Sequence, residues 1–267
     1  MEVRNSAVEQ KKKKNRSLWP LWVLAIALIV VPGAWLAQIF WGYHTADAAY
    51  SAVAEEATSP VQVTAEDGES YELLQIDWDA LRAQNPEVVG WLQVDALPQI
   101  SYPIVRAEND SYYLDHSFAC VSSKSGAIFM ETQNAGDFSD LYTIIYGHNM
   151  KNGSMFGGLK KFANADFCAQ NSHTVTLYTP DGIWRYEIFS AEYAQPDAAG
   201  VYTIGYAAGA DYLAYLNDMT ARSLYDFGMQ PSDSAPVLTL STCSGDEMRF
   251  VIHAQRTQQL VLQEQNG

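Results

Sequence analysis

The sequence predicts a mainly β domain, folded as a closed or nearly closed antiparallel barrel that carries helices. Three observations support this fold class. The 267 residues are 48% apolar and 18% charged, which suits one globular unit with appendages rather than a disordered or fibrous protein. Seven or eight short β-type runs follow one another beyond residue 100, and Gly, Asn and Asp separate them. Strands and helices do not alternate regularly, which argues against a parallel sheet.

The predicted elements begin with an amphipathic stretch from Tyr71 to Trp91. Asp77 is its candidate N-cap, and Asn85-Pro86 divides it into two short helices. A long helical insertion covers Ala210 to Tyr225, where apolar side chains recur at helical spacing. The predicted strands are Ser101–Val105, Gly126–Phe129, Tyr142–Tyr146, Thr174–Tyr178, Trp184–Tyr193, Val237–Thr242 and Arg249–Gln255.

Residues 17–43, from Ser17 to Tyr43, contain no charged side chain and predict one transmembrane helix. At about 1.5 Å per residue this run is longer than a hydrocarbon core of about 30 Å. Its Trp and Tyr residues cluster toward the two ends, as interfacial anchors do. A cleaved signal peptide is the alternative, for which Ala46-Asp47-Ala48 is the one weak cleavage site.

The flanks of the apolar run predict the compartments. Residues 1–16 form a basic tail in which Lys11–Lys14 and Arg16 directly precede the run, so we expect the N-terminus in the cytoplasm. Residues 44–69 are small and acidic, which predicts a flexible or loosely helical linker. Residues 70–267 are then expected outside the cell, as one domain of ordinary size.

Charge and motif content exclude several function classes. The net charge is −15, and the residues beyond position 17 alone carry −19, so the body lacks the basic face that nucleic-acid binding needs. The three cysteines and five histidines show no zinc or haem spacing, and no glycine-rich phosphate loop follows a strand. We therefore expect no metal and no cofactor. What remains is a cysteine nucleophile with a histidine that takes and returns its proton during acyl transfer.

Cys243 ends a predicted strand in which apolar and small polar residues alternate. If the five residues after it form a hairpin loop, Cys243 and Arg249 face each other across two antiparallel strands, with Cβ atoms about 5 Å apart. A thiol and a guanidinium would then share one surface. The alternative is that Cys243 is a small core residue, since free cysteine is often buried.

His148 ends another predicted strand, beside Gly147, and is well placed to reach a neighbouring strand end. The alternative is a surface histidine or a hydrogen-bonded core histidine. His253 has the same side-chain parity as Arg249 and is the second candidate for a catalytic imidazole.

These segments resemble one family in several ordered motifs. Thr239-Leu-Ser-Thr-Cys243 matches the T-L-x-T-C signature of sortases, the membrane-tethered cysteine transpeptidases of Gram-positive bacteria. The segment from Tyr146 to Phe156 (YGHNMKNGSMF) is similar to the histidine segment of class B sortases in particular. The resemblance spans about residues 75–255, because further matches are found in Asn85–Trp91, Tyr102–Val105 and Gly126–Phe129.

The resemblance implies an eight-stranded sortase-type β-barrel with N-terminal helices and a helical insertion before the cysteine strand. It implies that Cys243 attacks a Thr–Gly or Thr–Asn-type bond in a sorting motif, that His148 acts as acid and base, and that Arg249 steadies the substrate and the oxyanion. An amine of a cell-wall precursor or of another protein, such as a pilin, then resolves the thioacyl enzyme. The positions that line the substrate groove correspond to Tyr146, Ser241 and Thr242.

Two departures from the family pattern affect substrate contacts. The loop between Cys243 and Arg249 is shorter than is usual for the class, and Asn109-Asp110 exchanges an acidic and an amide residue. We therefore assign no substrate role to Asn109 or Asp110. Two other classes stay open: a cysteine peptidase or cell-wall hydrolase, which would release free acid, and a non-catalytic membrane-tethered binding domain, which predicts an unreactive Cys243.

Overall fold

The computed structural model describes residues 19–64, 70–243 and 248–260. The chain divides into two compact units, residues 1–42 and 43–267. Helix α1, Trp19–Ala57, contains Pro32. Among the described residues, no helix combines the length and the hydropathy that crossing a membrane requires. The transmembrane helix predicted for residues 17–43 is therefore not confirmed.

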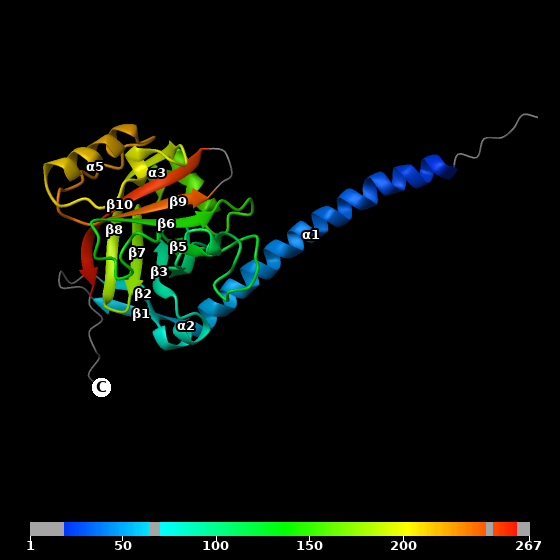
Figure 1. Ribbon diagram of the computed structural model, residues 1–267, viewed down its shortest axis with the longest axis horizontal. Helices are drawn as coiled ribbons and strands as arrows, with labels where there is room; N and C mark the ends of the chain where they lie inside the picture. Colours follow the sequence, from blue (N-terminus) through cyan, green and yellow to red (C-terminus); the bar gives the residue numbers. More distant parts are fainter. Residues whose placement is uncertain (1–18, 65–69, 244–247, 261–267) are drawn as a thin grey trace, which may run out of the picture. The chain divides into compact units, whose positions relative to one another are not determined.

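Eight strands of the second unit close into a barrel in the order β10-β8-β7-β3-β4-β5-β6-β9 (Figure 1). This confirms the mainly β barrel, but the barrel is not wholly antiparallel, because β4 pairs with β5 and β6 pairs with β9 in parallel. Parallel partners need long connections, which residues 106–127 and 149–236 supply here. The barrel strands are β3 (Val88–Val94), β4 (Ser101–Val105), β5 (Ile128–Met130), β6 (Tyr142–His148), β7 (Thr174–Thr179), β8 (Gly182–Ala194), β9 (Val237–Cys243) and β10 (Arg249–Leu260).

The predicted pair of helices between Tyr71 and Trp91 is wrong in two places. Only α2, Trp78–Gln84, is helical, and its N-cap is Asp77 as predicted, because the carboxylate accepts a hydrogen bond from Ala80 N at 2.9 Å. The residues before it form β2 (Ser70–Ile76), and those after Pro86 begin β3. Short apolar runs do not distinguish helix from strand by periodicity, so pairing with neighbouring strands decides between them.

The predicted linker, residues 44–69, is structured over most of its length. Helix α1 continues to Ala57, and Tyr50, Val53 and Ala57 are buried at helical spacing along one face. The Tyr50 hydroxyl donates to the Gly126 carbonyl at 2.8 Å. Strand β1 (Thr58–Thr64) then pairs with β2 in a two-stranded antiparallel sheet. The segment contains few apolar residues, but their helical spacing places them on one face, where they are buried.

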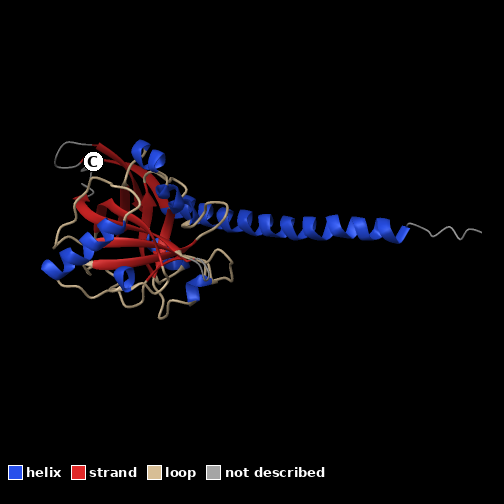
Figure 2. Ribbon diagram, turned by 90° about the horizontal axis from the view of Figure 1, so that it is seen from above, coloured by secondary structure: helices blue, strands red, loops and turns tan. Residues whose placement is uncertain are grey.

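The remaining helices lie on the outside of the strands (Figure 2). The predicted insertion is α5, Ala210–Arg222, which buries Tyr212, Leu216 and Met219 and packs against β8. Its predicted end at Tyr225 is three residues too far, because the chain leaves the helix at Ser223 and Leu224 N bonds to Ala191 O of β8 at 2.8 Å. The other helical segments are η1 (Tyr112–Leu114), η2 (Gly157–Ala163), α3 (Ala165–Gln170) and α4 (Ala199–Tyr202).

Candidate active site

The parallel pairing of β6 with β9 brings the predicted histidine and cysteine together. Their register aligns Tyr146 with Ser241 and His148 with Cys243, so both candidate side chains stand at neighbouring strand ends. Asn149 N continues the pairing with a hydrogen bond of 3.3 Å to the Cys243 carbonyl. The alternation of side chains along each strand does not predict that these two residues are neighbours. Their proximity depends on which strands pair in the barrel.

Arg249 lies across from Cys243 at the start of β10, as the predicted hairpin requires. The ladder between β9 and β10 is antiparallel and pairs Val251 with Ser241. Arg249 Nη1 donates to Cys243 Sγ at 3.9 Å. Arg249 Nε is buried and has no hydrogen-bond partner among the described residues. Residues 244–247, which make up most of the short loop, lie outside the described residues.

The His148 ring is held by the backbone of the β4–β5 connection. Its Nε2 lies 2.7 Å from the Leu114 carbonyl oxygen, which can only accept, so Nε2 carries the proton and Nδ1 is the basic nitrogen. Gly126, at φ +57°, leaves room for this ring, because a Cβ there would lie 2.9 Å from His148 Cδ2. The histidine is thus oriented by contacts from outside its own strand.

The surroundings of the Cys243 thiol favour its neutral form. Burial raises its pKa to about 11, although the charge of Arg249 and its hydrogen bond to the sulfur act in the opposite direction. The thiolate is the reactive form, so attack on a carbonyl requires a base that takes the proton. His148 stands on the neighbouring strand end, and histidine is the side chain that most often serves as such a base.

These side chains open onto a pocket of about 400 Å³. Two carboxyl groups that the sequence did not assign to the site lie in its wall. The Glu131 carboxylate accepts from the Tyr146 hydroxyl at 3.0 Å, and burial together with nearby Asp110 raises the pKa of Glu131. The lining residues are Asp110, Leu114, Phe129, Glu131, Tyr146, His148, Pro196, Cys243 and Arg249.

Of the three groove positions expected from the family pattern, only Tyr146 lines this pocket. Ser241 and Thr242 are fully buried. The Ser241 Oγ lies 2.9 Å from the Tyr202 hydroxyl, and Thr242 Oγ1 accepts from Phe250 N at 2.9 Å. Their hydroxyls are thus used within the protein, and a substrate role for either residue stays a prediction.

The second candidate imidazole, His253, lies in the core. It pairs with Thr239, four residues before Cys243 and so about 13 Å away along the strand. Its Nδ1 is 2.9 Å from Thr239 Oγ1, its Nε2 is 3.2 Å from the Glu192 carboxylate, and its side chain is fully buried. The structure therefore groups His148, and not His253, with Cys243.

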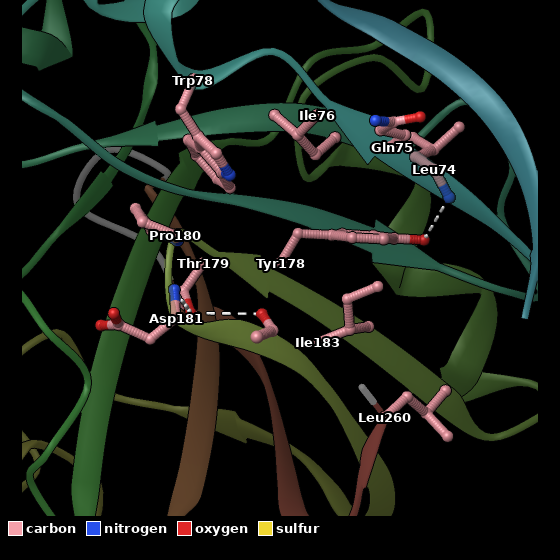
Figure 3. Close-up of a pocket in the computed structure, with 11 residues that line it drawn as sticks. Leu74, Gln75, Ile76, Trp78, Tyr178, Thr179, Pro180, Asp181, Ile183 and Leu260 are labelled. Atoms are coloured by element: carbon pink, nitrogen blue, oxygen red, sulfur yellow. Dashed lines mark hydrogen bonds between the residues drawn. The ribbon is translucent and has the colours of Figure 1, made fainter. Parts of the chain in front are cut away.

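A second hollow, of about 350 Å³, lies between β2 and the turn that joins β7 to β8. Figure 3 shows the Tyr178 ring extending across it, with the hydroxyl accepting a hydrogen bond of 3.2 Å from Leu74 N. Leu74, Ile76, Trp78 and other apolar groups form most of its wall. None of the candidate catalytic residues lines it.

The barrel and the arrangement of Cys243, His148 and Arg249 can be compared with known proteins. Residues 92–257, more than half of the chain, match the Sortase domain family. The chain belongs to the sortase family. Sortase B of Listeria monocytogenes is 34% identical over 169 residues, which are 62% of this chain and 67% of that protein.

Solved structures agree with the family match. The crystal structure of sortase B from B. anthracis is 28% identical, with a TM-score of 0.69 over 82% of this chain and 99% of that chain. Sortase B of Clostridium perfringens is 31% identical, with a TM-score of 0.62 over 67% of this chain and 99% of that chain. The enzyme is a class B sortase, a cysteine transpeptidase that cleaves sorting motifs. The family match favours this activity over the hydrolase and the binding domain that the sequence left open.

Proposed function

We propose that Cys243 is the nucleophile of the sorting reaction and that His148 moves its proton. Cys243 Sγ attacks the carbonyl carbon of the scissile peptide bond while Nδ1 of His148 takes the thiol proton. The C–N bond then breaks, and the imidazolium returns that proton to the leaving amine. The product of this half-reaction is a thioester between Cys243 and the Thr of the sorting motif.

The second half-reaction transfers the acyl group to an amine. The acceptor nitrogen attacks the thioester carbon, His148 takes its proton, and the proton returns to the departing Cys243 sulfur. The acceptor is an amine of a cell-wall precursor or of another surface protein, such as a pilin. The expected substrates carry a C-terminal motif of the N/S-P-x-T-G/N type.

Arg249 is proposed to bind the oxygen of the scissile carbonyl in both half-reactions. Its place in the wall of the pocket, with Nη1 3.9 Å from the Cys243 sulfur, supports this role, because a fixed donor is most effective where negative charge develops. The same guanidinium favours the Cys243 thiolate through its contact with the sulfur. The single observation that carries the proposal is the alignment of His148 with Cys243 on adjacent strand ends, with Arg249 contacting the sulfur.

The proposal also includes a single-pass membrane anchor, with the N-terminus in the cytoplasm and residues 70–267 outside the cell. It is supported by the uncharged run of residues 17–43 and by the Lys11–Lys14 cluster that precedes it. Protease added to intact protoplasts is expected to remove the C-terminal domain and spare the N-terminus. Full protection of the domain would contradict this topology.

The activity is tested with a peptide library of the N/S-P-x-T-G/N type, incubated with the full chain and analysed by mass. Cleavage between Thr and the following residue is expected, and an added amine, hydroxylamine, should be joined to the Thr carbonyl. Cys243→Ala should be inactive, whereas Cys168→Ala, which removes a different buried thiol, should react normally. A free acid as the only product in the presence of hydroxylamine would indicate a hydrolase instead.

A further inference from the structure

The chain between β8 and α5 reaches the edge of the active site. We call residues 195–203 the wall segment. Pro196 of this segment lines the pocket that contains Cys243. At its other end the Tyr202 hydroxyl lies 2.9 Å from Ser241 Oγ, two residues before Cys243. The Tyr202 ring also stacks on Tyr146, with ring centroids 6.4 Å apart and planes 23° apart.

The wall segment has little structure of its own to hold it in place. Helix α4 within it is a single turn of four residues, closed by bonds from Val201 N and Tyr202 N to the Ala198 carbonyl. Such a short turn is marginal without tertiary contacts. Its position is therefore set by the rest of the domain. Buried Val201 packs against Ala194 and Val251. Groups from outside also bond to the segment, such as the Tyr142 hydroxyl, which donates to the Val201 carbonyl at 2.7 Å.

Arg222, the last residue of α5, provides a charged contact of this kind. Its Nη2 donates to the Gly200 carbonyl of α4 at 2.7 Å. The plane of the guanidinium lies close to Gly200, since a Cβ there would come within 3.1 Å of Nη1. The same guanidinium forms a two-point ion pair with Glu192 of β8, through Nε at 2.7 Å and Nη2 at 2.9 Å. One planar group thus joins the barrel to the wall segment.

Glu192 is a fixed anchor for this contact. Only 3% of the residue is exposed, and its Oε1 also lies 3.2 Å from Nε2 of the buried His253. Burial opposes its ionisation, but the hydrogen bonds from His253 and Arg222 outweigh burial, so the pKa of Glu192 is lowered. A buried carboxylate with these partners stays charged and keeps the Arg222 side chain in one orientation.

We propose that Arg222 is a positioning residue for the sorting reaction: held by Glu192, it fixes the wall segment so that Pro196 and Tyr202 stand beside the nucleophile. The inference rests on the proposed function, because it concerns the groove that presents the sorting motif to Cys243. Arg222 does not line the pocket. Its loss should therefore weaken substrate binding and leave the reactivity of the Cys243 thiol unchanged.

The first test measures position without using activity. Amide hydrogen exchange is compared between wild type and Arg222→Ala in the full chain. The amides of residues 199–203 should exchange about tenfold faster or more in the variant, while the amides of β9 keep their protection. The matched control is Asp218→Ala, which removes the exposed partner of Arg222 and leaves Glu192 and Gly200 in place. Uniform acceleration over the whole barrel, or none at the wall segment, would overturn the proposal.

The second test separates binding from chemistry. With a library peptide that the wild-type enzyme cleaves, Arg222→Ala should raise KM between about tenfold and a hundredfold, the scale of a small displacement in a binding site. kcat and the rate of Cys243 alkylation by iodoacetamide should change less than about twofold. Arg222→Lys should recover little, since a point charge cannot replace the planar fork. A fall in kcat or in alkylation with KM unchanged would refute the positioning role.

A double-mutant cycle connects Arg222 to Tyr202. Tyr202→Phe removes only the Tyr202 hydroxyl, which contacts Ser241 Oγ. Its effect on KM should not add to that of Arg222→Ala, because both changes release the same segment. Full additivity would overturn the proposal. Should Arg222→Ala not fold, Gly200→Ala takes its place, since it keeps both charges and pushes the guanidinium aside. Should no peptide be cleaved by wild type, the proposed function fails, and the exchange measurement still decides the positioning of the segment.

Discussion

Replacing Arg249 by Ala removes the two interactions through which this residue is proposed to favour the reaction. Its guanidinium, which lines the pocket, is the donor proposed for the oxyanion, and Nη1 contacts the Cys243 sulfur at 3.9 Å. Loss of one oxyanion donor lowers rates by about a hundredfold or more, roughly 3 kcal/mol of transition-state stabilisation. Loss of the positive charge also raises the pKa of Cys243 further. Because both effects act in the same direction, kcat/KM for peptide cleavage should fall by about a hundredfold or more.

The assay compares kcat/KM of Arg249→Ala, Arg249→Lys and Arg256→Ala, with circular dichroism to show that each protein is folded. Arg249→Lys should recover little activity, because an ammonium does not reproduce the planar set of donors. Arg256→Ala is the matched control, since that guanidinium lies over the Trp184 ring at 4.6 Å and does not line the pocket. It should stay near wild type. A normal rate for folded Arg249→Ala would refute the role of Arg249.

Three further predictions concern the Cys243 thiol, the packing of Gly126 beside the His148 ring, and the buried His253. Alkylation of Cys243 by iodoacetamide should accelerate about tenfold per pH unit from pH 7 toward its pKa of about 11; a plateau near pH 8.5 would show that burial does not raise the pKa. In Gly126→Ala the added Cβ would clash with the Tyr113 carbonyl oxygen and lie 2.9 Å from His148 Cδ2, so the change should displace both the η1 backbone and the His148 ring and lower kcat/KM by about tenfold or more; an unchanged value would refute the steric argument. Burial lowers the pKa of His253, so the unfolded chain binds a proton below about pH 6.5 that the folded chain does not. The free energy of unfolding should therefore fall as the pH drops below that value, and His253→Asn should flatten this slope in urea titrations; an identical slope would contradict it.

Part of the site could be predicted from local sequence. Cys243 and Arg249 are separated by a loop short enough for a hairpin, so strand parity alone places them on one surface, as found. Glu131 could have been found in the same way, because it has the parity of Phe129 and directly follows its strand. The position of His148 beside Cys243 depends instead on a parallel pairing between strands that are far apart in the chain. The sequence makes His148 the first candidate because it ends a predicted strand beside Gly147, and the family resemblance points to the same histidine.

The parts that could not be predicted depend on tertiary packing. The segment from Ser70 to Ile76 has the composition of an amphipathic helix or a strand, and pairing with β1 makes it a strand. The role proposed for Arg222 needs three elements at once, because its guanidinium bonds Glu192 of β8 and Gly200 of α4 from the end of α5. No local pattern in the sequence predicts these hydrogen bonds, because they join three elements of the chain.

The central claim is that Cys243 forms the thioacyl enzyme. It is tested most directly by the mass of the intact chain while the enzyme turns over a sorting peptide that it cleaves. Wild type should carry the acyl fragment of the peptide as a hydroxylamine-labile adduct that peptide mapping places on Cys243. In Cys168→Ala the adduct should form as in wild type, and in His148→Ala its formation should be slower by about a hundredfold or more. An adduct on another residue, or turnover by Cys243→Ala, would contradict the account.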